Sequence, residues 1–234
     1  MRIFFLNLVE KVHILQNIYL KNKYFFKKKS YSMEGEDMIV DKYFKGINDG
    51  LYVDLGCYHP LQWNNTMLLY KRGWKGINID INEFSIKLFN FCRPNDINLN
   101  LAVSKQNGEV YFYSQKKLSL LSTIKKSRSD LVFQGKAKKK KILSKTLTEI
   151  LDNSIYKDKQ IDFLNLDIEG SDLEVLESLN FSRYSPKLIC VEILSKDTPV
   201  LENDVEHSDI YKLLSAKNYK KKWSGYFNHI FIRD

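Results

Sequence analysis

The sequence predicts an α/β fold with a mostly parallel, Rossmann-like seven-stranded sheet, one antiparallel strand and an additional N-terminal helix. Short apolar runs alternate along the chain with segments of helical periodicity, which is typical of strands joined by crossover helices. The last two apolar runs flank Gly225 and predict a hairpin, which reverses one strand of the sheet. With 234 residues and 44% apolar content, the chain can bury one sizeable core.

Residues 1–30 predict a basic amphipathic helical extension. Phe5, Leu8, Val12, Leu15 and Tyr19 recur at intervals of three and four, so they share one helical face, and a lysine run over 27–29 ends the pattern. Two interpretations stay open besides disorder. The helix packs on the domain or on a second subunit, as in a homo-oligomer, or it attaches peripherally to an anionic membrane surface.

The domain begins at residue 31, and its first half is predicted to contain a strand–helix–strand unit. An acidic segment over 31–37 precedes a short helix. The runs 51–55 and 77–80 predict buried parallel strands, and the intervening helix begins near Asn64 or Asn65 and stops at Gly73. A second helix over 84–91 is broken at Pro94. A third strand over 97–103 is followed by an Asn-Gly turn at 107–108 and a strand over 109–113.

Residues 114–145 predict a basic mobile loop, because apolar periodicity is lost among lysine and serine. Order returns with a helix over 146–151 and a strand over 161–167. Ser171 and Glu174 have the spacing of a capping box at the start of a helix. A strand over 187–193, a helix over 210–214 and the terminal hairpin complete the domain.

Charge is distributed unevenly and argues against nucleic acid as a partner. The net charge is +9, yet residues 1–30 contribute +6 and residues 115–145 contribute +10, so the rest of the chain is about −7. A nucleic-acid-binding protein more often spreads its basic residues over the folded binding face. The three cysteines are widely spaced and form no zinc-type cluster. They fit a reducing cytoplasm, and no segment reaches the roughly 20 apolar residues that span a bilayer.

The ends of the first two strands predict a site for an adenosine-bearing cofactor. Asp54 and Gly56 close the first strand, and Asp80 closes the second about 25 positions later. An acid in the second position accepts hydrogen bonds from both ribose hydroxyls. The first turn lacks the three glycines that cradle a pyrophosphate, which favours S-adenosylmethionine, whose cationic end suits Asp54. We therefore expect a methyltransferase, with the cofactor bound by Asp54, Gly56, Tyr58, Asp80, Ile81, Ala102 and Val103.

Several stretches of the chain resemble the FkbM-type S-adenosylmethionine-dependent methyltransferases. They follow one another in the order that the family uses, and they are residues 52–60, 65–66, 69–80, 93–96, 161–170 and 186–192. The resemblance extends from about residue 31 to the end. It implies the class I methyltransferase fold and O-methylation, often of sugars in bacterial surface glycans or of secondary metabolites. Two positions depart from the family pattern: Met33 replaces a common glutamine, and Asp80-Ile81 replaces a common Glu-Pro.

Three carboxylates are expected around the acceptor. Asp167 and Glu169 lie two apart at the end of a strand, so their side chains share one side, and Glu192 ends the neighbouring strand. They predict either a general base whose pKa is raised by like charges, or a divalent cation, Mg²⁺ or Mn²⁺, held by all three acids. Glu169 alone has a structural alternative, in which it caps or salt-bridges a nearby loop.

Further candidates surround these acids. His59 follows the glycine turn and is a candidate general base or a loop-orienting residue. Asn65 could orient the acceptor or cap its helix, and Trp63 could stack on a sugar face. His229 in the terminal hairpin is the remaining candidate substrate contact.

The sequence thus favours an O-methyltransferase of the cytoplasm, or of the inner face of the cytoplasmic membrane. Its expected acceptor is a sugar hydroxyl, either in a nucleotide-linked sugar or in a surface polysaccharide such as capsule or O-antigen. A methyltransferase of a non-sugar metabolite is the alternative, and an RNA-binding methyltransferase is less favoured.

Overall fold

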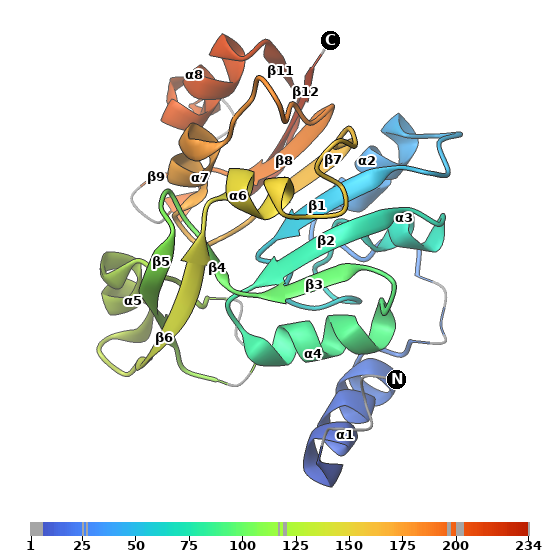
Figure 1. Cartoon of the computed structure of the whole chain (residues 1–234), viewed down its shortest axis with the longest axis vertical. Helices are drawn as coiled ribbons and strands as arrows, with labels where there is room; N and C mark the ends of the chain where they lie inside the picture. Colours follow the sequence, from blue (N-terminus) through green and yellow to red (C-terminus); the bar gives the residue numbers. More distant parts are fainter. Residues whose placement is uncertain are drawn as a thin grey trace.

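A computed structural model describes residues 7–24, 26, 28–116, 118, 121–195, 198–199 and 204–233, and shows a central twisted sheet between two layers of helices (Figure 1). Seven strands form this sheet in the order β11-β12-β8-β7-β1-β2-β3. Their bounds are β1 Leu51–Leu55, β2 Lys75–Asp80, β3 Ile97–Asn100, β7 Phe163–Leu166, β8 Leu188–Glu192, β11 Tyr219–Ser224 and β12 Asn228–Arg233.

The pairing confirms the predicted mostly parallel sheet with one antiparallel strand. Strands β1, β2, β3, β7 and β8 pair in parallel, while β12 runs antiparallel to both β8 and β11. Every residue of β1, β7 and β8 is buried, because helices cover both faces of a parallel sheet. The carboxyl ends of β1, β2 and β7 therefore meet at one edge of the sheet.

Two groups of helices cover the two faces. On one face, α6, α7 and α8 pack on the main core cluster, which includes Val53, Leu164 and Leu214. On the other, α2 and α3 pack around Trp74 and Phe44, and α4 packs beside α3. The helices are α2 Glu36–Tyr43, α3 Met67–Lys71, α4 Glu83–Cys92, α6 Leu147–Asp152, α7 Asp172–Ser178 and α8 Asp209–Ala216.

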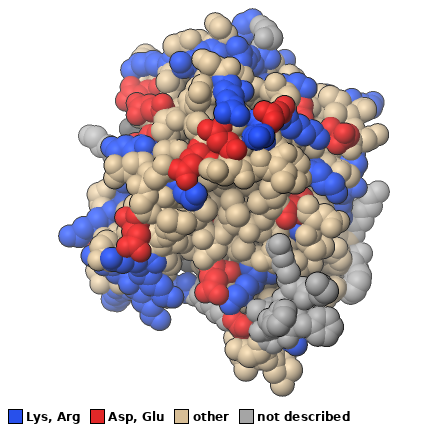
Figure 2. Space-filling view, viewed as in Figure 1, with Lys and Arg blue, Asp and Glu red and all other residues tan. Residues whose placement is uncertain are grey.

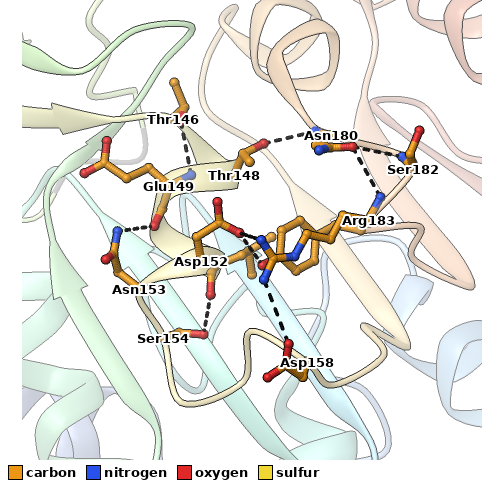
Figure 3. A network of polar contacts seen from close by, with 12 residues as sticks. Thr146, Thr148, Glu149, Asp152, Asn153, Ser154, Asp158, Asn180, Ser182 and Arg183 are labelled. Atoms are coloured by element: carbon orange, nitrogen blue, oxygen red, sulfur yellow. Dashed lines mark hydrogen bonds and ion pairs between the residues drawn. The ribbon is translucent and has the colours of Figure 1, made fainter.

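Polar contacts join α6 to the turn that follows α7 (Figure 3). The guanidinium of Arg183 lies 2.8 Å from the carboxylate of Asp152, which also accepts a hydrogen bond from the Tyr184 hydroxyl at 2.6 Å. The hydroxyl of Thr148 accepts a hydrogen bond from the Asn180 backbone. These contacts tie α6 to the segment that leads from α7 into β8.

The structure differs from the predicted loop over residues 114–145. Residues Lys126–Phe133 form helix α5 and Lys138–Lys145 form strand β6. Strand β6 pairs with β5 (Gly108–Ser114) and β4 (Ala102–Val103) in a separate three-stranded sheet. The lysines of β6 are exposed, so its solvated side chains conceal the strand in the sequence, and the backbone pairing with β5 overrides their low strand propensity. Minor elements are β9 Leu194–Ser195, β10 Thr198–Pro199 and the 3₁₀ turn η2 Val205–His207.

The expected N-terminal helix is present as α1 (Leu8–Leu15), continued by a π-helical segment η1 (Gln16–Lys21). It turns a different face inward from the one predicted. Ile14 and Ile18 are buried, whereas the predicted packing residues Leu8, Val12 and Leu15 are 45–77% exposed. The helix does pack on the domain, but through Ile14 and Ile18, and Tyr19 of the predicted row packs against the same cluster. Phe5 lies outside the described residues. In the part of the chain that the structure describes, we find no helix with the length and apolar content to cross a bilayer.

Candidate active site

A cavity opens at the carboxyl ends of β1, β2 and β7. This is where an open α/β sheet binds its ligands. The described residues that line it include several acids and no lysine or arginine. They are Met33, Glu36, Asp54, Gly56, Cys57, Tyr58, Trp63, Asn65, Ile79, Asp80, Ile81, Leu101, Ala102, Val103, Ser122, Ile124, Asn165, Asp167, Ile168, Glu169, Ser171 and Asn228. The excess of carboxylates suits a ligand with positive charge.

The turn after β1 requires a glycine for two reasons. Gly56 has φ +73°, in the left-handed region that favours glycine. A Cβ at this position would lie 1.7 Å from the carbonyl oxygen of Asp167, at the end of β7. The backbone of the turn therefore packs directly against the backbone of the β7 loop, with no room for a side chain between them. Together they form the floor of the cavity.

Asp54 is held rigidly beneath this turn. Its Oδ1 accepts a hydrogen bond from the Asn165 amide at 2.9 Å, and its Oδ2 accepts one from the Thr66 hydroxyl, also at 2.9 Å. Thr66 in turn accepts a hydrogen bond from the fully buried Arg93 at 2.7 Å. Burial raises the pKa of Asp54, and these hydrogen bonds together with the Arg93 charge oppose that rise. The network therefore favours the ionised form of Asp54 even though its side chain is buried.

Asp80 ends β2 and faces the same cavity. Its Oδ2 accepts the backbone N–H of Tyr58 at 2.8 Å, and its Oδ1 accepts that of Asn82 at 2.6 Å. Burial raises its pKa to about 6, although both hydrogen bonds act in the opposite direction. Each oxygen keeps a second lone pair, so the carboxylate can accept two hydroxyl hydrogen bonds from a ribose.

Apolar residues line the wall beside Asp80. Ile81 follows the acid directly, and Ala102 and Val103 come from β4. The Tyr58 ring stacks on Trp63 with ring centroids 5.8 Å apart, and both residues have positive φ. The apolar side chains of Ile81, Ala102 and Val103 suit an adenine ring. All seven residues predicted to bind the cofactor line this one cavity.

Asp167 and Glu169 both line the cavity, as predicted, although the strand ends before them. Strand β7 stops at Leu166, and Glu169 has φ +56°, so strand alternation does not account for their shared side. Instead, Asp172 accepts hydrogen bonds from the backbone N–H groups of Ile168 and Gly170, which folds the loop back. Burial first, and then Glu169 and other acids, raise the pKa of Asp167 well above its usual range.

The basic segment, residues 114–145, contacts the acidic loop after β7. The Arg128 Nη2 on α5 lies 2.7 Å from Glu169 Oε2, and the Thr123 hydroxyl donates to the Glu169 carbonyl at 2.9 Å. Lys125 forms an ion pair with Glu174 at the start of α7. Residues 122–128 therefore cover part of the cavity and are fixed to it by polar contacts. The ion pair with Arg128 confirms the structural alternative for Glu169, in which it salt-bridges a nearby loop.

Three candidates lie outside the cavity lining. His59 is fully buried, its Nδ1 accepts the Leu61 N–H at 3.0 Å, and burial lowers its pKa to about 3. It orients the loop after β1, and its burial away from the cavity does not support a role as general base. His229 is likewise buried, and this burial lowers its pKa to about 4. Successive residues of β12 point to opposite faces, and it is the neighbour Asn228 that faces the cavity. A substrate contact by His229 is therefore not supported.

Glu192 is buried behind the acidic loop and does not line the cavity either. Its pKa is raised far above the usual range, first by burial and then by the nearby Asp167 and Glu169. The side chain therefore holds its proton near neutral pH. A protonated Glu192 adds no further negative charge beside Asp167 and Glu169.

The predicted divalent cation does not fit the residues that are present. Among the residues that the structure describes, no three His, Cys, Asp or Glu side chains converge as a metal-binding group. Glu169 directs its carboxylate to Arg128, and Glu192 is the protonated acid described above. The proposed set of Asp167, Glu169 and Glu192 therefore lacks two of its three ligands.

The structure adds cavity residues that were missed in the sequence. Glu36 from α2 is fully buried and accepts a hydrogen bond from the Asn228 amide of β12 at 2.8 Å. Asn165 links Asp54 to Asn65, whose amide donates to Asn165 Oδ1 at 2.9 Å. Asn65 therefore does not cap α3. The acidic segment over 31–37 was the only sequence signal for Glu36, because its contact with Asn228 spans 192 residues.

Comparison with known proteins identifies the family. Residues 46–221, well over half of the chain, match the domain described as the methyltransferase FkbM domain. The chain belongs to the FkbM methyltransferase family. Membership implies S-adenosylmethionine as the methyl donor, and the cavity fits it, because Asp80 can accept hydrogen bonds from ribose hydroxyls and the acidic floor near Asp54 suits the cationic amino-acid end.

A solved structure of low sequence similarity was also found. It is a TehB-like SAM-dependent methyltransferase from Corynebacterium glutamicum, with 8% identity, 97% of each chain covered and a TM-score of 0.46. No curated protein matches the sequence of this FkbM family member.

Proposed function

We propose that this FkbM methyltransferase transfers a methyl group to a sugar hydroxyl, in a nucleotide-linked sugar or in a surface polysaccharide. The proposal rests on one part of the cavity, the residues that line it outside the region expected to bind the cofactor. We call this part the acceptor half. Carboxylates and amides line it, including Asp167, Asn65 and Asn228, and Trp63 offers an aromatic face beside them. Several hydrogen-bonding groups around one aromatic plane suit a polyhydroxylated ring.

Asp167 is the residue that we assign as general base. Methyl transfer is an in-line displacement, so the acceptor oxygen must lose a proton as it attacks. Burial and like charges raise the pKa of Asp167, which makes its carboxylate a better proton acceptor than an ordinary aspartate. No hydrogen bond occupies this carboxylate in the part of the chain that the structure describes. The cofactor supplies the methyl group, and the protein aligns the hydroxyl.

Glu169 takes a positioning role instead. Its ion pair with Arg128 neutralises much of its charge and fixes its side chain. Because Glu169 also lines the cavity, this fixed side chain can help to orient the acceptor ring against Asp167. The two acids thus differ in environment, and we assign them different roles.

The lysines of β6 favour an extended acceptor. Strand β6 approaches the cavity only at Ser144 and Lys145, which pair with β4. Lys138–Lys141 lie three to six residues further along the strand, so they are about 10–20 Å from that point. At that distance they suit the anionic groups of an acceptor that extends out of the cavity. An anionic glycan that extends from the cavity could reach them, and Figure 2 shows basic side chains gathered over this region at the lower left.

One experiment tests the proposal. The purified enzyme would be incubated with S-adenosylmethionine and a panel of nucleotide sugars, bacterial polysaccharides and non-sugar hydroxyl compounds, and the products analysed by mass spectrometry. We expect methylated sugar that is lost in Asp167→Asn. Methylation of non-sugar compounds alone would favour the metabolite alternative, and S-adenosylmethionine binding without any methylated sugar would contradict the proposed acceptor class.

A further inference from the structure

The N-terminal helix presents a row of apolar side chains to solvent. Leu8 is 77% exposed and Leu20 74%, with Val9, Val12 and Leu15 between 45% and 62%. We call these five residues the apolar face of the helix. In Figure 2 the tip of the molecule at the bottom, where α1 lies in Figure 1, carries mainly uncharged atoms. A cluster of exposed aliphatic side chains on one helix marks an interaction surface.

The apolar face is not a consequence of poor packing, because the same helix is anchored by its opposite side. Ile14 and Ile18 are buried in a cluster with Phe84 and Leu88 of α4. Glu10 forms an ion pair with Lys87 at 2.6 Å. The helix therefore has two apolar sides, and only one of them is used by the domain.

The charge around the apolar face indicates what it binds. Residues 1–30 carry a net charge of +6, and their only acid, Glu10, is paired with Lys87. Lys21, Lys23 and Lys29 are exposed close to the apolar face in sequence. Two copies of this segment placed face to face would bring like charges together, whereas an anionic surface would complement them. Apolar residues on one side with lysines beside them are the pattern of a helix that lies on an anionic bilayer.

The helix also adjoins the active-site cavity. A groove lined by His13, Asn17, Lys21 and Tyr58 lies beside it, and Tyr58 lines the cavity as well. Asn22, just after η1, hydrogen-bonds to His59 at 3.2 Å. A surface that binds the helix would therefore lie near the loop that forms one wall of the active site.

We propose that the apolar face and its flanking lysines dock this methyltransferase on an anionic lipid bilayer. The apolar side chains enter the boundary between headgroups and acyl chains, and the lysines contact the headgroups. The active site then works close to the lipid surface. This inference is independent of the acceptor, because docking requires neither cofactor nor acceptor.

The test is sedimentation of the full chain with vesicles. Vesicles of phosphatidylcholine mixed with phosphatidylglycerol would be compared with vesicles of phosphatidylcholine alone, at low and high salt. We expect binding only to the mixed vesicles, weakened by salt as the charges are screened. Val12→Glu/Leu15→Glu should weaken it about tenfold or more. Lys23→Glu/Lys29→Glu should weaken it as well. Ile155→Glu is the matched control, since Ile155 is an 83% exposed aliphatic residue outside the helix.

Two measurements keep the outcome clear. Affinity for S-adenosylmethionine, measured by calorimetry, should be unchanged in every variant and shows that each has folded. Equal binding to both kinds of vesicle, or equal binding of wild type and Val12→Glu/Leu15→Glu, would overturn the proposal. So would a dimer, detected by light scattering, that this variant abolishes while the wild type binds no vesicles, because a second copy would then cover the face.

Discussion

Arg128 Nη2 lies 2.7 Å from Glu169 Oε2, and the two side chains are only 10% and 11% exposed. The pair connects the basic segment, with its helix α5, to the acidic loop after β7. It closes one side of the cavity and gives Glu169 a partner that an isolated acid in this position would lack.

Arg128→Ala should destabilise the protein by about 3 kcal/mol, because it leaves the Glu169 carboxylate largely buried without its cation. The free energy of unfolding can be measured by urea denaturation. Lys141→Ala is the matched control: its pair with Glu109 has side chains 58% and 66% exposed, so we expect little or no loss. Equal losses in the two variants would show that burial of the Arg128 pair has no energetic consequence.

Gly56→Ala should abolish cofactor binding. The added methyl group would lie 1.7 Å from the Asp167 carbonyl oxygen, so the turn and the β7 loop must separate. Gly46→Ala is the control for backbone strain alone, since Gly46 has a similar φ of +88° but a Cβ there would meet nothing within 4 Å. We expect about 1 kcal/mol of destabilisation and normal S-adenosylmethionine affinity in this control. Calorimetry of both variants checks the prediction, which retained binding in Gly56→Ala would contradict.

The sheet and the cofactor half of the cavity could be predicted from the sequence because both depend on local signals. Apolar runs define buried strands, and an acid or glycine that directly follows a strand must lie at its carboxyl end. Asp54, Gly56 and Asp80 were therefore placed correctly in the cavity. Their positions follow from the strand ends, whatever the rest of the chain does.

The acceptor half could not be predicted, because it depends on long-range packing. Glu36 and Asn228 meet from opposite ends of the chain, and Arg128 comes from a segment whose lysines conceal a helix and a strand. His59 and His229 show that a position next to a strand end does not by itself place a side chain in the cavity. A histidine beside a strand end is a candidate base in the sequence, yet its side chain can point into the core, where it stays neutral.

Affinity for S-adenosylmethionine should fall as the pH is lowered from 7 to 5. Asp80 has a pKa of about 6, so it is mainly ionised at pH 7 and mainly protonated at pH 5, where it loses acceptor capacity. We expect a decrease of about tenfold, one factor of ten per unit below the pKa. Asp80→Asn should bind weakly at both pH values. If this variant keeps the full pH dependence, another group is responsible for it.

His229→Leu should stabilise the protein, most clearly in acid. Both ring nitrogens lack a hydrogen-bond partner among the described residues, and burial lowers the pKa from 6.5 to about 4. Between these values the unfolded state binds more protons, so this histidine lowers the free energy of unfolding as the pH falls. We expect the variant to gain roughly 2 kcal/mol relative to wild type on going from pH 7 to pH 5. A constant difference in urea denaturation at the two pH values would contradict this.

Asp167→Asn should lower kcat by about 10²- to 10⁴-fold, the usual contribution of a general base. The amide has nearly the same shape but cannot accept the proton, so S-adenosylmethionine affinity should stay within about twofold of wild type. Since the pKa of Asp167 is raised, wild-type activity should increase with pH as the carboxylate ionises, and the variant should lose that increase. Glu169→Gln separates the two acids: loss of a positioning residue should mainly raise the acceptor KM. The pH profile should keep its shape but move to lower pH, because the Glu169 charge that helps to raise the pKa of Asp167 is gone. If Glu169→Gln rather than Asp167→Asn removes the pH dependence, the roles of base and positioning residue must be exchanged.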